Sequence, residues 1–519
     1  MKKTAFSLRI ILVLSVFSLL SFFKYEQTIS LEIYTLSALC VFFSCFFGPA
    51  LFLTVNLPFL IIAVVDWHLI RMYRLSVTDA AAWISMLILD TNRIEVYEYL
   101  LKINIAEYAL LFLAFLSAFF VWFYRPARKA QTLFYVIFWL AFPLSYISHI
   151  YPAARLFLIS EEKSALNKHN SFKFASSSSP EAAQNVIVII GESHRYGEFQ
   201  ESFQKYEQKF TPLYNFSDFI SNYANTMNAV PIILSRKKFK DKPVSFHEKS
   251  VFSLFEEAGY ETYFLHYTDS SNFTEKNKLS FIYNDAMHFV NFAAPKGSLH
   301  DIRIYRELNK ILTGSKQKKF IVIKMLGIHI DFQYRYPIEY DIRKPSLKDT
   351  ESKSTFFKAI KAKLFSLSAS MSSKNKEIIL NTYKNAMDYS VEIIQNLFDL
   401  AKKQEESTLV MFSSDHSICI FDKDAFQIPP DCKEAFHIPV LFYLNPALNQ
   451  TTEPEKLKKL SCNTDKPLTQ EYLFETIASL AGISYPAADK EYDLTEKCFS
   501  APVKRNIDQI SVQSLYEDL

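Results

Sequence analysis

Two groups of acidic and imidazole side chains follow apolar, β-rich runs in the second half of the chain. Glu192 comes just after the run at 185–190, and Asp415 with His416 comes after the run at 408–412. In open α/β sheets, catalytic and ligand-binding residues gather at the carboxyl ends of strands. Carboxylates combined with an imidazole suit zinc or manganese. These residues therefore predict a divalent-metal site at one edge of a sheet.

The apolar runs that would build this sheet alternate with helical patterns. We expect buried strands at 185–190, 262–265, 320–325, 408–412 and 440–444. Such alternation is typical of an α/β sheet with helices on both faces. The C-terminal part, about 335 residues, is long enough to bury one large core. We therefore predict one α/β domain at 185–519, with a Ser- and Lys-rich surface insertion at 344–376.

The composition narrows the function classes. The 519 residues include only 8 Gly, against 48 Phe and 29 Tyr. So few glycines leave no G-x-G-x-x-G fingerprint or phosphate loop, which disfavours a nucleotide-binding fold. A net charge of +3 gives no electrostatic reason to expect a nucleic acid partner. A charged fraction of 21% is low for a cytosolic globule and indicates a membrane-embedded part.

The first third contains apolar runs long enough to span a bilayer. There are five of them, at 8–23, 31–47, 51–70, 108–123 and 132–150. Two basic clusters flank the runs, namely Lys2, Lys3 and Arg9 before the first and Arg125, Arg128 and Lys129 between the fourth and fifth. Basic residues are retained on the cytoplasmic side, so five crossings place both clusters there and the rest of the chain on the other side.

The predicted organisation is a membrane domain at 1–155, a linker at 156–184 and an exported domain at 185–519. The segment 71–105 mixes charged and apolar residues, as an amphipathic segment on the outer membrane face or a solvated loop would. A cleaved signal peptide is the weaker interpretation of the first run, because no small-x-small site follows Phe23 and four more runs come after it.

The cysteine positions suit an exported domain. Cys419, Cys432, Cys462 and Cys498 allow three disulfide pairings, and proximity favours Cys419 with Cys432 and Cys462 with Cys498. The sequence has no C-x-x-C motif, so we do not expect a zinc site built from cysteines.

Six motifs, in order along the chain, resemble those of the phosphoethanolamine transferases, membrane enzymes of the alkaline-phosphatase and sulfatase superfamily. They are NVIVIIGESHR at 185–195, NTMNAVP at 225–231, GIH with YRYP at 327–337, NTYKNAM at 381–387, SDH at 414–416 and HIPV at 437–440. The resemblance implies a sulfatase-like (alkaline-phosphatase-like) α/β domain behind about five transmembrane helices. It also implies a bacterial inner-membrane protein whose catalytic domain faces the periplasm. The sequence does not fix the oligomeric state, and we expect a monomer.

The resemblance assigns roles to site residues. It implies that Thr226 is the nucleophile and that Glu192, Thr226, Asp415 and His416 hold a divalent metal ion, zinc first, with manganese or magnesium as alternatives. A cation bound directly to a Thr hydroxyl stabilises its alkoxide and neutralises phosphoryl oxygens. The implied reaction moves phosphoethanolamine from phosphatidylethanolamine to lipid A, a lipooligosaccharide core or another periplasmic glycan, through a covalent phospho-threonine.

Four further residues have two interpretations each. His329 either protonates the leaving oxygen or binds substrate phosphate, or it is a structural histidine at a strand end. His437 either lies close to the metal or makes structural hydrogen bonds. Arg195 and Arg236 either contact phosphate or pair with a carboxylate.

The loop after His416 departs from the family pattern. Ser417 stands where the family has Gly, and a histidine that the family has farther along is absent. The sequence therefore does not settle the identity of the acceptor or whether a second metal ion binds. Two rival functions remain: a glycerophosphate transferase similar to lipoteichoic acid synthases, and a degenerate membrane-bound scaffold or binding protein. A sulfatase is disfavoured because no C-x-P-x-R or S-x-P-x-R site surrounds Thr226.

Overall fold

The computed structural model describes most of the C-terminal part of the chain. The described residues are 172–239, 248–266, 282, 285–292, 301–330, 332–351, 375–422, 426–427, 432–499 and 505. All of them belong to one compact unit. The five predicted membrane spans, the segment 71–105 and most of the predicted insertion lie outside these residues. Within the described part of the chain, no helix is both long and apolar enough to cross a membrane.

A seven-stranded sheet forms the centre of this unit, in the order β3-β11-β8-β2-β7-β5-β6. Its strands are β2 (Asn185–Gly191), β3 (Leu213–Phe216), β5 (Glu261–His266), β6 (His288–Asn291), β7 (Lys319–Lys324), β8 (Thr408–Ser414) and β11 (Val440–Leu444). The strands from β8 to β6 are parallel, and β11 is antiparallel to both of its neighbours. All five predicted strands are present, and the structure adds β3 and β6 at the two edges of the sheet.

Side chains of β2 alternate between two cores, one on each face of the sheet. Val186, Val188 and Ile190 belong to one core, and Ile187 and Ile189 belong to the other. Because both faces are covered, the strand is buried along its whole length and reads as a continuous apolar run. The predicted α/β architecture with helices on both faces is therefore confirmed.

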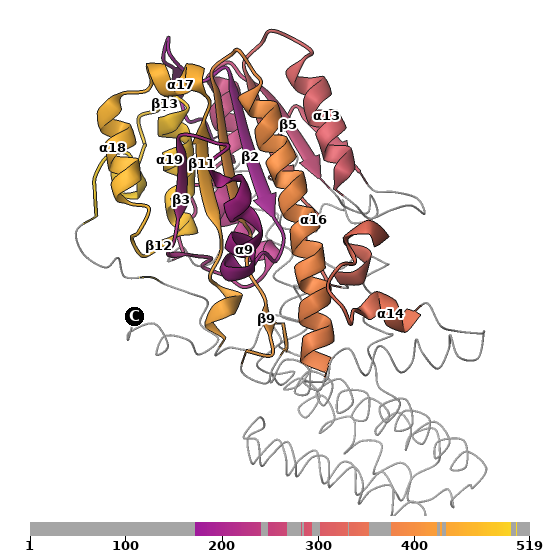
Figure 1. Cartoon of the computed structure of the whole chain (residues 1–519). Coiled ribbons are helices and arrows are strands. Elements are labelled where there is room, and N and C mark those ends of the chain that lie inside the picture. The colour runs from indigo at the N-terminus through magenta and orange to yellow at the C-terminus, as the bar shows by residue number, and fades with distance from the viewer. Residues whose placement is uncertain are drawn as a thin grey trace, which may run out of the picture. The chain divides into compact units, whose positions relative to one another are not determined.

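The helices divide between these two faces. The Ile187 face packs against α9 (Tyr196–Glu207), α13 (Ile302–Leu312) and α16 (Lys376–Lys402). Figure 1 shows α9 and the long α16 lying across the near face of the sheet. The opposite face packs against α10 (Thr226–Leu234), α11 (Val251–Glu257), α17 (Pro446–Thr451), α18 (Pro454–Cys462) and α19 (Leu473–Leu480).

Short elements make up the rest of the secondary structure in the described residues. Three two-stranded pairs form between β1 (Ser177–Ser178) and β13 (Ile483–Ser484), β4 (Phe219–Ile220) and β12 (Leu468–Thr469), and β9 (Cys419–Ile420) and β10 (Phe426–Gln427). The remaining elements are the α-helix α14 (Leu347–Glu351) and the 3-10 turns η3 (Phe332–Tyr334), η4 (Ile338–Tyr340), η6 (Lys433–Ala435), η7 (Gln470–Tyr472) and η8 (Lys490–Tyr492).

The packed domain begins before residue 185, inside the predicted linker. Phe174 is 3% exposed and belongs to the core that contains Val186. Ser177 pairs with Ser484, which fixes the start of the described chain to its C-terminal part. A linker was predicted here, but a two-residue strand and one buried aromatic ring hold this segment on the domain.

Both predicted disulfides are confirmed, between Cys419 and Cys432 and between Cys462 and Cys498.

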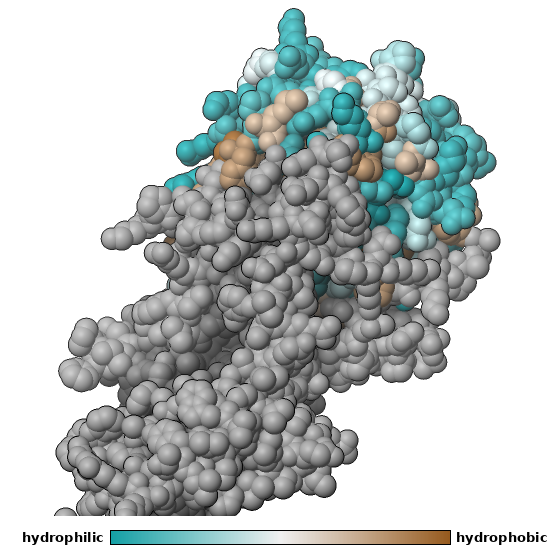
Figure 2. All heavy atoms as spheres, turned by 180° about the vertical axis from the view of Figure 1, so that it is seen from behind, coloured by the Kyte–Doolittle hydropathy of each residue, from teal (hydrophilic) through white to brown (hydrophobic). Residues whose placement is uncertain are grey.

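Figure 2 shows the molecule from the side opposite to Figure 1. The described surface on this side is mainly hydrophilic, with apolar side chains in small separate groups. This distribution is ordinary for a domain whose visible face meets water.

Candidate active site

Four predicted site residues come together at the carboxyl end of the sheet. The Thr226 hydroxyl lies 3.1 Å from Glu192 Oε2, 2.8 Å from Asp415 Oδ2 and 3.4 Å from His416 Nε2. His416 Nε2 is also 3.3 Å from Glu192 Oε1. One ligand atom from each of Glu192, Asp415 and His416 can be chosen so that all lie within 4.8 Å of one another. The cluster is compact enough for a single ion.

Two strands and one helix bring these residues to the same place. Glu192 follows β2 and Asp415 follows β8, and the two strands pair in parallel with Gly191 opposite Ser414. Thr226 is the first residue of α10, whose preceding residue Asn225 accepts a hydrogen bond from Asn228 N and so caps the helix. The amino end of a helix carries partial positive charge, which favours an oxyanion on Thr226 and an anionic ligand next to it.

Hydrogen bonds to the backbone carbonyl and to the carboxylate hold Asp415 in place. The Asp415 carbonyl accepts hydrogen bonds from the Ser221 hydroxyl at 2.8 Å and from Gln470 Nε2 at 2.6 Å. Its Oδ1 accepts from the backbone N–H groups of His416 and Ser193. The other carboxylate oxygen, Oδ2, is the one that faces Thr226.

The His416 ring has the orientation that a metal ligand needs. Its Nδ1 lies 2.8 Å from the Ser417 carbonyl, so Nδ1 donates to that oxygen. In the neutral form that binds a metal, the lone pair of Nε2 then faces the cluster. A backbone carbonyl bound to the second ring nitrogen is the usual partner of a ligating histidine. Two carboxylates, one such imidazole and a hydroxyl are a donor set that fits a divalent ion.

A fifth residue, Lys324 at the end of β7, enters the cluster. Its Nζ lies 2.8 Å from Glu192 Oε2 and 3.1 Å from Asp415 Oδ2, and the residue is 4% exposed. Sequence reasoning misses it because the apolar run at 320–325 predicts only a buried strand. The available signal was a lysine that closes a buried strand adjacent to the strand leading to Glu192, since a buried lysine needs a carboxylate partner.

Burial and charge set the protonation of the cluster. Burial opposes the charge on Glu192, but Lys324 and His416 hold its pKa well below the usual range. The pKa of Asp415 is raised by burial and by the charge of Glu192. Burial lowers the pKa of His416, but Asp415 and Glu192 outweigh it and raise that pKa to about 9. Burial also opposes the charge on Lys324, while the two carboxylates raise its pKa above the usual value.

The segment with His329 packs directly against Glu192. The backbone of Gly327 has φ +54°, and a Cβ there would lie 2.8 Å from the Glu192 Cβ and backbone nitrogen. Asp301 accepts the N–H groups of Leu326 and Gly327 and so holds this turn. The charge on His329 contributes to the low pKa of Glu192. The turn therefore needs glycine for its approach to the cluster.

The arginine of the YRYP motif supports the same segment. Arg335 is buried and donates to the His329 carbonyl at 2.8 Å and to the Ile330 carbonyl at 2.6 Å. His329 Nδ1 lies 2.7 Å from the Ile330 carbonyl. These contacts set the direction of the His329 ring.

The NTYKN motif positions the Glu192 loop from α16. The hydroxyl of Tyr383 donates to the Ser193 carbonyl at 2.8 Å and accepts from Arg195 N at 2.9 Å. Two residues along, Asn385 accepts from Arg343 N and donates to Asp341. The motif therefore acts on the cluster through the backbone next to Glu192.

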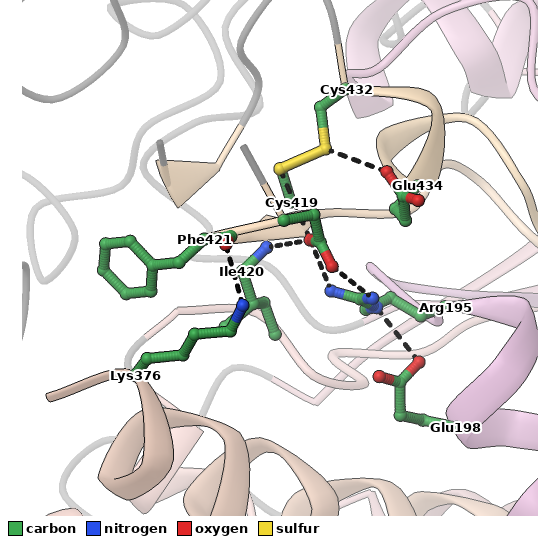
Figure 3. The surroundings of a disulfide bond; sticks show 9 residues. Arg195, Glu198, Lys376, Cys419, Ile420, Phe421, Cys432 and Glu434 are labelled. Carbon is green, nitrogen blue, oxygen red and sulfur yellow. Dashed lines mark hydrogen bonds and ion pairs between the residues drawn. A yellow bond between two sulfur atoms is a disulfide. The ribbon is translucent and has the colours of Figure 1, made fainter. Parts of the chain in front are cut away.

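The two arginines singled out from the sequence pair with carboxylates. Arg195 holds Asp422 with two hydrogen bonds of 2.8 and 2.9 Å and Glu198 with one of 3.0 Å. Figure 3 shows Arg195 and Glu198 beside the Cys419–Cys432 disulfide. This grouping joins the helix after Glu192 to the loop after His416.

Arg236 and His437 are also held by neighbours outside the cluster. Arg236 lies 3.3 Å from Glu248 and 3.4 Å from Glu475. His437 Nε2 lies 3.0 Å from the Ser217 carbonyl, and its ring stacks on Tyr196 at 4.3 Å between centroids. Of the two interpretations offered for each residue, the contacts favour the structural one.

Comparison with known proteins identifies the family of this domain. The family model described as Sulfatase matches residues 184–483, which is more than half of the chain. The chain belongs to the sulfatase family. The match covers the strands from β2 to β12 and includes all five residues of the cluster.

This sulfatase-family chain also resembles curated phosphoethanolamine transferases, as predicted from its motifs. It is 21% identical over 384 residues to the Escherichia coli protein EptC, a match that covers 66% of this chain and 59% of that protein. It is 21% identical over 341 residues to CptA of Salmonella typhimurium, covering 62% of this chain and 55% of the relative. The matches thus span less than two thirds of each relative.

Solved structures show the same fold at low sequence identity. The periplasmic domain of Escherichia coli EptC, in complex with Zn, superposes with a TM-score of 0.52 at 16% identity over 63% of this chain and 90% of that one. The integral membrane lipooligosaccharide phosphoethanolamine transferase A of Neisseria meningitidis superposes with a TM-score of 0.65 at 13% identity over 95% of this chain and 98% of that one. The sulfatase-like domain predicted from the sequence is confirmed.

Proposed function

We propose that this chain transfers phosphoethanolamine from phosphatidylethanolamine to a glycan or glycolipid acceptor of the bacterial envelope. The observation that carries the proposal is the hydroxyl of Thr226 at the amino end of α10, within 3.4 Å of the side chains of Glu192, Asp415 and His416. A threonine needs such surroundings to act as a nucleophile. The curated relatives named phosphoethanolamine transferases support the choice of group transferred.

The same four residues would hold the metal ion. Glu192, Asp415 and His416 supply charged and imidazole ligands, and Thr226 supplies its oxygen. Zinc is the first candidate, since it suits this donor set and a related domain was solved with Zn, and manganese or magnesium are the others. When bound, a divalent cation would stabilise the Thr226 oxyanion and neutralise charge on the phosphoryl oxygens.

In the first half-reaction, Thr226 Oγ1 forms a bond to the donor phosphorus, and the bond from phosphorus to the diacylglycerol oxygen breaks. The Thr226 proton passes to Asp415 Oδ2, its hydrogen-bond partner at 2.8 Å. His329 protonates the departing diacylglycerol oxygen. The product is a phosphoethanolamine ester on Thr226.

In the second half-reaction, an acceptor hydroxyl or phosphate attacks this ester. The bond between Thr226 Oγ1 and phosphorus breaks, and the threonine regains its proton from Asp415. The proton that an acceptor hydroxyl loses passes to His329, which restores the acid used in the first half-reaction. A membrane domain at 1–155 would keep the site near a lipid donor, which agrees with an inner-membrane protein whose catalytic domain faces the periplasm.

The test is mass spectrometry of envelope glycolipids from cells with and without the gene. The proposal predicts a phosphoethanolamine increment that disappears on deletion and returns with the wild-type gene, but not with Thr226→Ala. Consumption of phosphatidylglycerol and a glycerophosphate increment would support the lipoteichoic-acid-synthase-like alternative. No change in any envelope component would favour a scaffold or binding protein.

A further inference from the structure

Lys324 directs its ammonium group at three oxygen atoms of the cluster. The Nζ atom donates to Glu192 Oε2 at 2.8 Å and to the Gly191 carbonyl at 3.2 Å, and it lies 3.1 Å from Asp415 Oδ2. The Met325 carbonyl lies 3.4 Å away as a fourth acceptor, so oxygen atoms surround all three N–H donors of the ammonium group. β7 places it there, because Lys324 pairs in register with Ile190 of β2.

The two carboxylate oxygens that face Lys324 are the ones that face Thr226. Glu192 Oε2 and Asp415 Oδ2 each lie within 3.1 Å of both Lys324 Nζ and Thr226 Oγ1. The lysine and the threonine therefore lie on one shared pair of oxygens. A cation placed there acts directly on the environment of the Thr226 hydroxyl.

The position of Lys324 changes the net charge of the buried group and so affects how many metal ions it can bind. With His416 neutral, as a metal ligand must be, Glu192 and Asp415 carry two negative charges, and Lys324 cancels one of them. A single divalent ion then changes the net charge of the buried group from −1 to +1, whereas a second ion would raise it to +3. Like charges a few ångströms apart in a buried site repel strongly, so the second ion is disfavoured.

We propose that Lys324 is a fixed cation, supplied by the protein, that takes the place of a second metal ion in this site. It holds Glu192 and Asp415 together before metal binds and limits the site to one divalent ion. The inference rests on the metal-binding role that the proposed function gives to these two carboxylates, and it deepens that role.

The test measures metal content and thermal stability of the full chain purified in detergent, stripped with a chelator and titrated with zinc. Lys324→Met removes the charge and keeps much of the volume. The matched control is Lys319→Met, because Lys319 is 3% exposed at the opposite end of the same strand and donates to the Ser315 carbonyl. Lys324→Arg keeps the charge. An effect seen in Lys324→Met but not in Lys324→Arg therefore comes from the lost charge and not from altered packing.

The proposal predicts one zinc ion per wild-type chain. Lys324→Met should lower the melting temperature of the metal-free chain more than Lys319→Met does, because the two carboxylates then repel. Zinc should bind Lys324→Met at least about tenfold more tightly than wild type, since the competing cation is gone. Lys324→Arg should still bind one ion with nearly the wild-type affinity.

Two results would overturn the inference. Two zinc ions per wild-type chain would show that Lys324 does not replace a metal ion. Equal melting temperatures and zinc affinities for the two Met variants, with one ion in wild type, would overturn the role of Lys324 and leave the metal site intact. A wild-type chain that bound no zinc and gained no stability from it would instead contradict the metal site of the proposed function, and this inference with it.

Discussion

The hydroxyl of Thr226 lies 2.8 Å from Asp415 Oδ2, although the two residues are 189 positions apart in the chain. The contact exists because α10 begins at the place where β8 ends. It joins the predicted nucleophile to a predicted metal ligand in a way that neither motif shows alone.

Two variants at Thr226 should separate its hydroxyl from its volume. Thr226→Ser keeps an oxygen within reach of Asp415 and should retain measurable transfer. Thr226→Val keeps the volume but removes the nucleophile, and should lower turnover by at least about a thousandfold. Turnover is measured with phosphatidylethanolamine and envelope glycolipid. A Thr226→Val enzyme within tenfold of wild type would exclude a covalent role for Thr226.

Gly327→Ala should weaken metal binding. The added Cβ would lie 2.8 Å from the Glu192 Cβ and backbone nitrogen, at a backbone φ of +54°, so Glu192 must shift. Gly259→Ala is the matched control, because Gly259 has φ +89° and nothing within 4 Å of the added Cβ. We expect Gly259→Ala to cost about 1 kcal/mol of folding free energy and to leave zinc affinity unchanged. Equal zinc affinities for both variants would mean that the turn does not position Glu192.

The contact between Arg195 and Asp422 should contribute to the stability of the domain. Asp422→Asn leaves the buried Arg195 with one of its two carboxylate partners, and should lower the free energy of unfolding by about 3 kcal/mol. Glu201→Gln, which removes an exposed partner of Lys384, should cost less than about 1 kcal/mol. Pulse proteolysis in urea gives both values. A loss of the same size in the two variants would show that Arg195 does not tie the loop after His416 to α9.

His194 should make the metal-free chain sensitive to acid. Burial and Lys324 lower its pKa from 6.5 to about 3, so the folded state resists a proton that the unfolded state accepts below pH 6.5. The stability supplied by neutral His194 is fully present above pH 6.5 and is lost as the pH falls toward about 3. The slope from this one group is about 1.4 kcal/mol per pH unit.

His416 does not contribute to the pH dependence of stability between pH 6.5 and about 3. Its pKa is raised to about 9, so it is protonated in both states below pH 6.5. His194→Gln can keep the hydrogen bond to Ser390 and does not titrate. Urea unfolding in the presence of a chelator should give a shallower pH slope for this variant than for wild type. Identical slopes would mean that His194 is not held neutral.

Much of the fold followed from local patterns. Five apolar runs predicted the five central strands, because strands covered on both faces cannot alternate with polar residues. The edge strands β3 and β6 escaped notice, since four-residue strands at a sheet edge carry little pattern of their own. The two disulfides followed from proximity along the chain alone.

The site residues that lie within recognisable short motifs could be predicted from the sequence. They are Glu192, Thr226, Asp415 and His416. Lys324 and Gln470 were not predictable in this way, because each acts through a contact with residues distant in sequence. Arg195 shows the reverse problem, since its charge suggested a phosphate contact, whereas its side chain, just before α9, pairs with Asp422 instead. A single sequence does not reveal which partner a charged side chain finds across the fold.

The covalent phospho-threonine is tested most directly by the intact mass of the zinc-loaded full chain after incubation with phosphatidylethanolamine and no acceptor. We expect an added phosphoethanolamine group, located at Thr226 by peptide fragmentation, that is absent in Thr226→Ala and removed when envelope glycolipid is supplied. An unmodified chain under these conditions, or the same adduct in Thr226→Ala, would contradict the covalent phospho-threonine.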